Sequence, residues 1–324
     1  MAKTVYLAPL EGLADAPMRE VLCRHGHYDR CYSEFLRVTD LVMPEKTMIR
    51  EVPEFNTGCK TADGTPIGIQ FLGDNKDTIS KSALKAYNLG ARFIDMNFGC
   101  PSRFVHHGGA MLLKEPELMH SIVSELRQTL PDDCSLSVKV RLGFSDQSEA
   151  PEIIRSIALD GVSEITVHCR TRKGLYRDDA LNWSALKDLH EIAGRVKLIA
   201  NGNINSYEDS LLCQQQTLCD SFMCGRGAFS VPNLGAVIKD KAKPYSLSQI
   251  LKTDIEVIET FSKTDRTQKV VMDRAKQFLG YARAHRIELK PFFLVFCRCQ
   301  NIKEGLELLE EKIKSEEQNE SWNN

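Results

Sequence analysis

The chain has 324 residues, of which 42% are hydrophobic and 27% charged, and its formal net charge is −2. This composition is typical of a soluble globular protein, and no apolar run reaches the ~20 residues that a membrane-spanning helix needs. The first residues lack the layout of a secretory signal, and the eleven cysteines include no CxxC pair. We therefore expect a cytoplasmic protein with reduced thiols, without a disulfide framework, a metal site or a membrane anchor.

The first 230 residues alternate between short strand-like runs and longer segments with helical spacing, of which 75–89, 116–130 and 207–219 look amphipathic. Eight strands that alternate with helices are what a (β/α)8 TIM barrel requires, and the length of the chain fits one. An open, doubly wound sheet is the alternative, although its usual GxGxxG fingerprint is missing. The predicted strands are 5–10, 30–35, 66–72, 93–99, 135–143, 164–171, 196–204 and 221–229.

After Pro244 the spacing of apolar residues becomes purely helical, with Pro291 as an internal break. The predicted helical segments are 247–261, 267–283 and 292–313. The last residues, SEEQNESWNN, are polar and acidic and have the composition of a disordered tail. We expect a barrel domain over residues 1–243, a small all-helical domain over 244–313 and a disordered acidic tail over 314–324.

Charge is distributed unevenly along this C-terminal part. Residues 262–303 hold ten Lys or Arg against Asp265, Asp273 and Glu288, a local net charge of +7, and the tail from Glu304 onward is acidic. A basic block in a neutral chain is a candidate phosphate-facing surface. Taken alone, such a block is more often a solvated helical face.

Polar residues occupy alternate positions near the C-terminal ends of four predicted strands. Helices cover the outside of a parallel barrel, so these side chains should point inward. A lone inward Gln or His is more often a satisfied structural group. Four strands with this pattern at the end where barrel enzymes place their sites favour an active-site mouth. The polar residues are Gln70, Asp95, Asn97, Ser137, Lys139, Arg141, Thr166, His168 and Arg170.

The seventh and eighth predicted strands end in IANGNI and CGRG. Glycine lets backbone N–H groups approach an anion closely, and Arg226 can add a charge-assisted hydrogen bond to a phosphate. A glycine pair alone would indicate turn chemistry. Because the loops after strands seven and eight commonly bind phosphate in this barrel, we predict a bound phosphate there.

Cys100 follows the fourth predicted strand in the segment NFGCPSR, between Gly99 and Pro101. These neighbours predict a stiff turn that holds the thiol at the mouth. A single cysteine is by default an inert buried residue, but a thiol that stays protonated at neutral pH can act as an acid. The glycine-rich stretch HHGGAMLL at 106–113 is interpreted as a mobile loop.

These motifs, in this order and spacing, resemble the tRNA-dihydrouridine synthases over almost the whole chain, from Tyr6 to about Lys303. SEFLRV at 33–38 and RAKQFLGY at 274–281 are most similar to the bacterial C-type branch, which modifies uridine 16 in the D-loop of tRNA. The other shared motifs are LAPLEG at 7–12, IDMNFGCPS at 94–102, LLKEPEL at 112–118, SVKVRLG at 137–143, VHCRT at 167–171, ANGNI at 200–204 and GRGA at 225–228.

The resemblance implies an FMN-containing barrel followed by a helical tRNA-binding domain. We infer no obligate protein partner from the sequence and expect a monomer. NADPH would reduce the FMN, which would pass hydride to C6 of the uracil while Cys100 protonates C5. The uridine would have to be flipped out of the folded RNA into the mouth. A cation such as Lys139 beside the flavin would stabilise its anionic reduced form.

Residue by residue, the resemblance implies three groups of contacts. Pro9, Leu10 and Glu11 would lie along the isoalloxazine, and Gln70, Lys139 and His168 would contact the flavin. The phosphate and ribityl end of FMN would be held by Asn201, Gly202, Asn203, Gly225 and Arg226. The tRNA would be contacted by Arg37, Asn97, Tyr176, Arg274, Lys276, Tyr281 and Arg298, with Asn97 on the substrate base.

The chain departs from the family pattern at three places. Leu10 replaces the usual Met, Arg103 stands where Lys is common, and the stretch between Val105 and Gly108 is shorter than usual. Three rival functions fit parts of the sequence. They are an FMN-dependent barrel reductase of a free pyrimidine or small molecule, an aldolase-type barrel in which Lys139 forms a Schiff base, and a non-catalytic RNA-binding protein.

Overall fold

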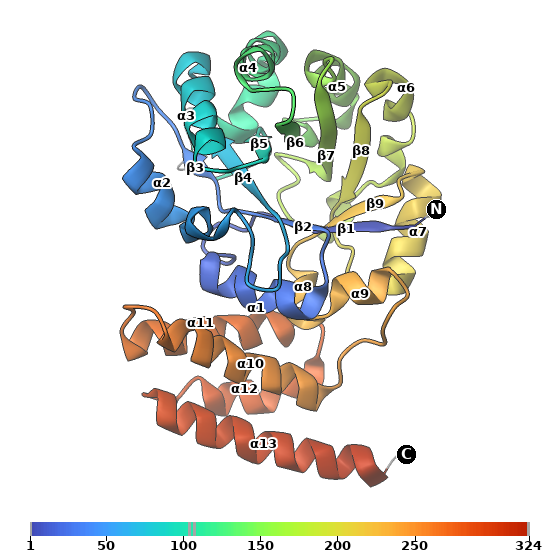
Figure 1. The fold of residues 1–324 in the computed structure, drawn as a ribbon. Helices are drawn as coiled ribbons and strands as arrows, with labels where there is room; N and C mark the ends of the chain where they lie inside the picture. The colour runs from blue at the N-terminus through green and yellow to red at the C-terminus, as the bar shows by residue number, and fades with distance from the viewer. Residues whose placement is uncertain (1, 103–104, 106–107, 323–324) are drawn as a thin grey trace.

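A computed structural model describes residues 2–102, 105 and 108–322. Its parallel strands close into a barrel surrounded by helices, so the predicted (β/α)8 architecture is confirmed (Figure 1). The strand order is β2-β1-β9-β8-β7-β6-β5-β4-β3, and β2 also pairs with β4, which closes the ring. The strands are β1 Thr4–Leu7, β2 Arg30–Tyr32, β3 Leu36–Arg37, β4 Ile67–Leu72, β5 Phe93–Asn97, β6 Ser135–Gly143, β7 Val162–Thr171, β8 Lys197–Asn201 and β9 Ser221–Cys224.

The second position of the barrel is divided between two short strands. Both β2 and β3 pair with β4, β2 through Cys31 and β3 through Leu36. The sequence predicted one strand over 30–35, but the chain leaves the sheet after Tyr32. The backbone N–H of Gln70 on β4 bonds instead to the hydroxyl of Ser33. This interruption places Phe35 at the barrel mouth.

Helices alternate with the strands and cover the barrel. Several begin at side chains that accept hydrogen bonds from backbone N–H groups of the first turn, as Asn75 and Ser206 do. The α-helices of the barrel are α1 Ala16–Gly26, α2 Glu45–Glu51, α3 Lys76–Asn88, α4 Pro116–Thr129, α5 Ala150–Ile157, α6 Leu189–Ala193, α7 Tyr207–Thr217, α8 Gly227–Ser230 and α9 Leu234–Ile238. Short 3-10 helices are η1 Pro53–Thr57, η2 Gly109–Lys114, η3 Gln147–Glu149, η4 Asp178–Ala180, η5 Ser184–Leu186 and η6 Ile287–Leu289.

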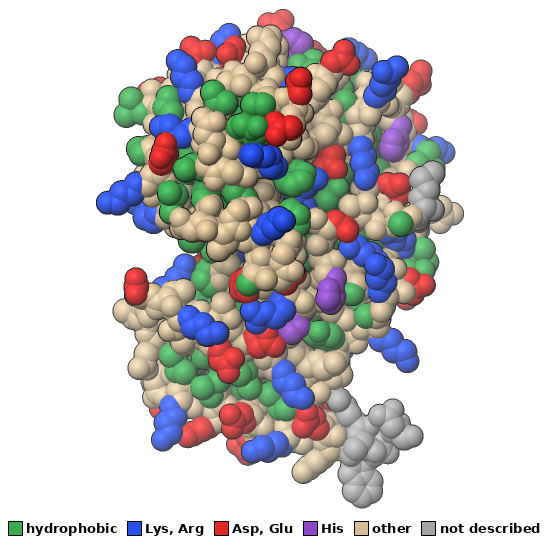
Figure 2. Space-filling view, viewed as in Figure 1, with side chains coloured by type: hydrophobic (Ala, Val, Ile, Leu, Met, Phe, Trp, Pro, Cys, Tyr) green, Lys and Arg blue, Asp and Glu red, His purple; other side chains and the backbone are tan. Residues whose placement is uncertain are grey.

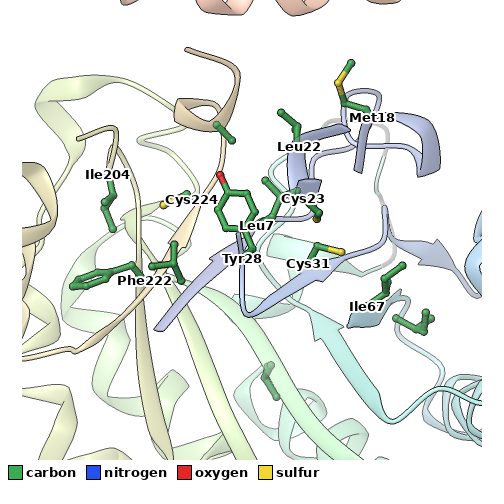
Figure 3. Packing of buried hydrophobic residues seen from close by; sticks show 14 of the residues in the cluster. Leu7, Met18, Leu22, Cys23, Tyr28, Cys31, Ile67, Ile204, Phe222 and Cys224 are labelled. Atoms are coloured by element: carbon green, nitrogen blue, oxygen red, sulfur yellow. The ribbon is translucent and has the colours of Figure 1, made fainter. Parts of the chain in front are cut away.

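Two apolar layers hold the barrel together, because alternate residues of a strand point to opposite faces. On β1, Val5 and Leu7 belong to the large outer cluster between strands and helices, whereas Tyr6 and the next residue after the strand, Ala8, belong to a smaller inner cluster. Figure 3 shows part of the outer layer, which Leu22 of α1 shares with Leu7.

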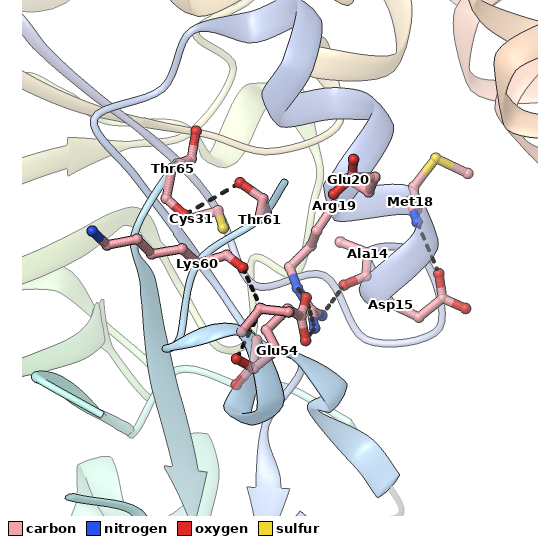
Figure 4. Close-up of polar contacts among 12 residues, drawn as sticks. Ala14, Asp15, Met18, Arg19, Glu20, Cys31, Glu54, Lys60, Thr61 and Thr65 are labelled. Carbon is pink, nitrogen blue, oxygen red and sulfur yellow. Dashed lines mark hydrogen bonds and ion pairs between the residues drawn. The ribbon is translucent and has the colours of Figure 1, made fainter. Parts of the chain in front are cut away.

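A buried ion pair fixes the start of α1. Arg19 is fully buried and its guanidinium lies 2.7 Å from Glu54 of η1. Its Nη1 also donates to the carbonyl of Ala14 at 2.7 Å (Figure 4). Breaking such a pair leaves an unpaired buried charge, so this contact holds the turn after β1 in one position.

The C-terminal helices form a layer that packs below the barrel in Figure 1, where α10 contacts α1. We call α10–α13 the helical layer. The capping box of Ser246 and Gln249 begins α10, and the hydroxyl of Thr267 caps α11. The helices are α10 Leu247–Ser262, α11 Gln268–Ala282, α12 Lys290–Phe296 and α13 Ile302–Trp322.

The elements of this layer differ from the sequence predictions at two places. The segment predicted as one helix over 292–313 is split into α12 and α13, because Pro291 lies in the first turn of α12 and Asn301 bonds to the N–H of Glu304 at 3.0 Å to start α13. The tail expected to be disordered over 314–324 continues α13 up to Trp322. An ion pair between Lys252 of α10 and Glu317 ties it to the layer.

Positive charge is not segregated on the face shown in Figure 2, where Lys and Arg are interspersed with Asp and Glu over both the barrel and the helical layer. In the part of the chain that the structure describes, no helix combines the length and apolar character that crossing a membrane requires.

Candidate active site

A cavity of about 770 Å³ opens at the C-terminal ends of the strands. We call it the mouth cavity. Residues after β1, β5 and β9 line it together with residues of β4, β6, β7 and β8, and α11 of the helical layer adds Gly280 and Tyr281. All eleven residues predicted to contact the flavin line this cavity: Pro9, Leu10, Glu11, Gln70, Lys139, His168, Asn201, Gly202, Asn203, Gly225 and Arg226.

A second cavity of about 830 Å³ adjoins the first, and we call it the side cavity. Arg37 of β3 and Glu51 of α2 line it, with Leu175 and Val105. The residues that line both cavities are Glu11, Phe35, Cys100, Pro101 and Tyr176. Cys100 therefore lies where a group bound in one cavity would meet a group bound in the other.

Hydrogen bonds hold the Cys100 turn rigidly. The side-chain oxygen of Asn97 accepts from the backbone N–H groups of Gly99 at 2.8 Å and of Cys100 at 2.9 Å. The carbonyl of Cys100 accepts from the N–H of Ala110 at 3.0 Å. Gly109 has a positive φ of 55°, and a Cβ there would come within 3.0 Å of the Cys100 carbonyl oxygen.

We interpreted the glycine-rich stretch at 106–113 as a mobile loop. From residue 109 onward this interpretation is wrong, because the stretch forms η2, whose residues are mostly buried. The glycine at 109 instead allows close packing against the Cys100 turn. Residues 106 and 107 lie outside the described part of the chain, as does Arg103. Burial raises the pKa of the Cys100 thiol. The thiol consequently stays protonated at neutral pH, as a proton donor must.

The side chains of Asn97, Gln70 and Asp95 form a hydrogen-bonded chain that starts at the residue holding the Cys100 turn. Asn97 Nδ2 donates to Gln70 Oε1 at 2.7 Å, and Gln70 Nε2 donates to Asp95 Oδ2 at 2.6 Å. Asp95 is fully buried and also accepts from Ser137; burial raises its pKa to about 6. An amide nitrogen has two donors, so Asn97 retains one N–H that can be offered to a ligand in the mouth cavity.

Lys139 lies within the barrel and its Nζ donates to Asn201 Oδ1 at 3.1 Å. Burial, together with the charge of the neighbouring Arg141, lowers its pKa to about 8. His168 is buried, and burial with the surrounding cations lowers its pKa well below the usual range. His168 is therefore neutral at pH 7, and its Nε2 lies 3.2 Å from the Arg170 guanidinium.

Cations and a glycine turn make one end of the mouth cavity suitable for an anion. Gly202 has φ of 126°, and a Cβ there would come within 3.0 Å of Leu181 and 3.2 Å of His168. Nη2 of Arg170 is buried without a hydrogen-bond partner among the described residues, although it lies 3.5 Å from Asp178. The unsatisfied nitrogen, the tight turn and Arg226 fit a phosphate group.

Sequence reasoning placed Arg141 and Arg170 among the inward polar residues of the predicted mouth, but it gave neither residue a role in binding or catalysis. Arg141 is buried, and its Nε donates to the carbonyl of Gly99 while Nη1 donates to that of Leu175, both at 2.8 Å. It thereby joins the Cys100 turn to the loop that carries Tyr176, over whose ring its guanidinium lies at 5.2 Å.

The residues predicted to contact tRNA fall into two groups. Asn97, Tyr176 and Tyr281 line the mouth cavity, and Arg37 lines the side cavity. The others lie in the helical layer and line neither cavity. Arg274 is paired with Asp15, Lys276 donates to the carbonyl of Cys299, and Arg298 is exposed.

The described residues contain no group of three or more His, Cys, Asp or Glu side chains arranged to hold a metal ion. Leu10, which departs from the family pattern, lines the mouth cavity near Gly225.

Comparisons with known proteins show which proteins this chain is similar to. The profile of the dihydrouridine synthase (Dus) family matches residues 6–320. The chain is 37% identical to a tRNA-dihydrouridine(16) synthase of Haemophilus influenzae, over 95% of this chain and 99% of that one. It is 38% identical to a protein of the same name from Vibrio parahaemolyticus, over 89% of this chain and 90% of that one. Among solved structures, the fold is shared with DHODH from Eimeria tenella, which was solved in complex with ferulenol. The TM-score is 0.53 and the sequence identity is 15%, and the match covers 76% of this chain and 81% of that one.

Proposed function

Because this chain belongs to the dihydrouridine synthase (Dus) family of flavin-dependent tRNA-modifying oxidoreductases, we propose that it reduces the C5–C6 double bond of uridine 16 in the D-loop of tRNA. The family resemblance predicted from the motifs is confirmed. The position in tRNA rests on relatives that are named for position 16.

One observation carries the proposal. The residues expected to hold a flavin line a single cavity, and Cys100 stands where that cavity meets a second one. A flavin in the mouth cavity and a uracil entering from the side cavity would meet beside the thiol. The free pyrimidine alternative is not favoured, because the similar proteins are named for tRNA and the matched region includes the helical layer.

We take the flavin to be FMN, because Gly202, Arg226 and Arg170 offer one anionic group a site at the end of the cavity. NADPH is the proposed reductant. When bound, the flavin supplies the hydride that adds to C6 of the uracil. Lys139 would lie beside it, and an adjacent cation favours the reduced anionic form.

The chain itself supplies the proton and the geometry. Hydride addition at C6 leaves enolate-like charge that requires a proton at C5, and Cys100 holds that proton because burial keeps the thiol neutral. Asn97 fixes the Cys100 turn with its oxygen and has an N–H left for the base. Arg141 fixes the position of the Cys100 turn relative to the loop that carries Tyr176, because it donates hydrogen bonds to carbonyl groups of both.

The tRNA would approach across the helical layer, and the target uridine would be flipped into the cavity. Tyr281 of α11 lines the mouth cavity, so the layer expected to bind tRNA reaches the reaction site. We propose residues 1–243 as the catalytic domain and residues 244–313 as the tRNA-binding domain. A cytoplasmic monomer suffices for this role, because residues of one chain line both cavities.

The test is dihydrouridine mapping in tRNA from cells that lack the gene. The proposal predicts that dihydrouridine is lost at position 16 alone and returns when the intact gene is restored. Unchanged dihydrouridine at position 16 would overturn it, and loss at a different position would refute the assignment of uridine 16.

A further inference from the structure

We propose that Glu11 returns a proton to Cys100 after each reduction, as the relay between solvent and the thiol. This inference rests on the proposed function, because it concerns the proton that the uracil takes from Cys100.

A relay is needed because the reaction leaves Cys100 as a thiolate. Burial raises the pKa of this thiol, so the anion is costly in its position and must be reprotonated before the next turnover. The thiol is only partly accessible, and its turn is held by Asn97 and by the packing of Gly109. A fixed turn cannot swing Cys100 out to bulk water to recover its proton.

Glu11 has the position that this task requires. Among the described residues that line both cavities, Glu11 is the sole carboxylic acid. Its charge raises the pKa of the Cys100 thiol, so the two groups interact electrostatically. The Glu11 side chain is exposed at the rim, where it can exchange protons with solvent.

Glu11 also titrates in the range that a relay needs. Partial burial raises its pKa to about 7, and the nearby carboxylates of Glu34 and Glu51 contribute to the rise. At neutral pH the side chain therefore exists in both protonation states, and it can donate a proton or accept one. The titratable and charged groups around it are Glu34 between β2 and β3, Arg37 on β3, Glu51 on α2, and Cys100 and Tyr176 from the shared wall.

The protons balance over one cycle. Cys100 gives its proton to C5 of the uracil and becomes a thiolate. The protonated carboxyl group of Glu11 then transfers its proton to the sulfur and becomes a carboxylate, which takes a proton from solvent. No further oxidant or reductant is involved, and the net proton on C5 comes from water.

The first test compares one turnover with many in Glu11→Gln. Enzyme with prereduced flavin and protonated Cys100, compared at equal bound flavin because Glu11 also lines the mouth cavity, should lose far less of its single-turnover rate on unmodified tRNA than of its steady-state turnover. Steady-state turnover should fall roughly tenfold, less than the usual 10²–10⁴-fold contribution of a positioned acid, because water can slowly replace the relay. Small carboxylic acids added to the buffer should restore it.

The pH profile supplies a second prediction. Steady-state turnover of the original protein should decline as pH rises through about 7, where Glu11 loses its proton. Glu11→Gln should be slow without this inflection. Glu45→Gln, at the exposed start of α2 and lining neither cavity, is the matched control and should keep the original profile.

A readout independent of turnover is the alkylation rate of Cys100 in the flavin-loaded protein, followed at its own peptide so that the exposed Cys297 does not interfere. Removing the charge of Glu11 should lower the thiol pKa and speed alkylation at neutral pH. Equal losses in single and multiple turnover, or an unchanged alkylation rate, would overturn the relay. If the original protein reduced no tRNA uridine at all, the proposed function itself would fail.

Discussion

Arg274 of α11 forms an ion pair with Asp15, the residue that caps α1, with 2.7 Å between Nη2 and Oδ1. Nη1 of Arg274 also donates to the carbonyl of Gly12 at 2.6 Å. Gly12 directly follows Glu11, so this arginine connects the helical layer to the segment that lines the mouth cavity. The residue expected to bind tRNA phosphate is thus already engaged within the protein.

We therefore predict that Arg274→Ala destabilises the protein by about 2 kcal/mol, because it removes charge-assisted hydrogen bonds from a mostly buried position. The free energy of unfolding, measured with denaturant, checks this. Lys269→Ala, whose ion pair on the same helix is exposed, is the control and should change stability by less than about 0.5 kcal/mol. Equal effects of both substitutions would show that the Asp15 contact does not support the interface.

Much of the barrel and its site could be predicted because the signals are local. Apolar runs marked the strands, and alternating polar residues such as Lys139 and His168 marked the mouth. The partners of Arg274 could not be predicted, since Asp15 and Gly12 lie about 260 positions away in the chain. Arg170 belongs to the same pattern of alternating polar residues as His168. The sequence could not show, however, that its Nη2 lacks a hydrogen-bond partner among the described residues near the Gly202 turn.

Cys100→Ala should retain flavin and tRNA binding while uridine reduction falls by roughly 10²–10⁴-fold, the usual contribution of a positioned acid. Reduction of the flavin by NADPH should continue at the original rate, because the thiol is not needed for that step. Stopped-flow absorbance separates the two half-reactions. Cys297→Ala, at the exposed cysteine, should leave both unchanged. Full uridine reduction by Cys100→Ala would remove the assigned role.

Gly202→Ala should weaken flavin binding about tenfold or more, because the new Cβ would press on Leu181 and His168 at a φ of 126°. Fluorescence titration of the flavin-free protein measures the affinity. Gly194→Ala, another glycine with positive φ but with open space around it, is the control. It should lower stability without changing flavin affinity. An unaltered affinity in Gly202→Ala would place the flavin elsewhere.

Asp254 should make the protein less stable as pH rises. It is fully buried in α10, neither carboxyl oxygen has a hydrogen-bond partner among the described residues, and burial raises its pKa well above the usual value. The folded state therefore keeps a proton that the unfolded chain releases above about pH 4. The stability from this group is complete below that pH and is lost as pH rises through the folded pKa.

Asp254→Asn should consequently flatten the pH dependence of the unfolding free energy and raise stability at alkaline pH by about 1–3 kcal/mol. Asp273→Asn, at an exposed position on α11, is the matched control and should leave the curve nearly unchanged. Parallel curves for Asp254→Asn and the original protein would contradict the assignment of a neutral buried carboxyl.

The most direct measurement is the reoxidation of reduced, flavin-loaded protein by unmodified tRNA in the absence of oxygen. We predict that oxidised-flavin absorbance returns with tRNA, that one dihydrouridine forms for each flavin reoxidised, and that free uridine at the same concentration gives almost no reaction. A flavin that stays reduced in the presence of tRNA, or that reacts equally well with free uridine, would contradict the account.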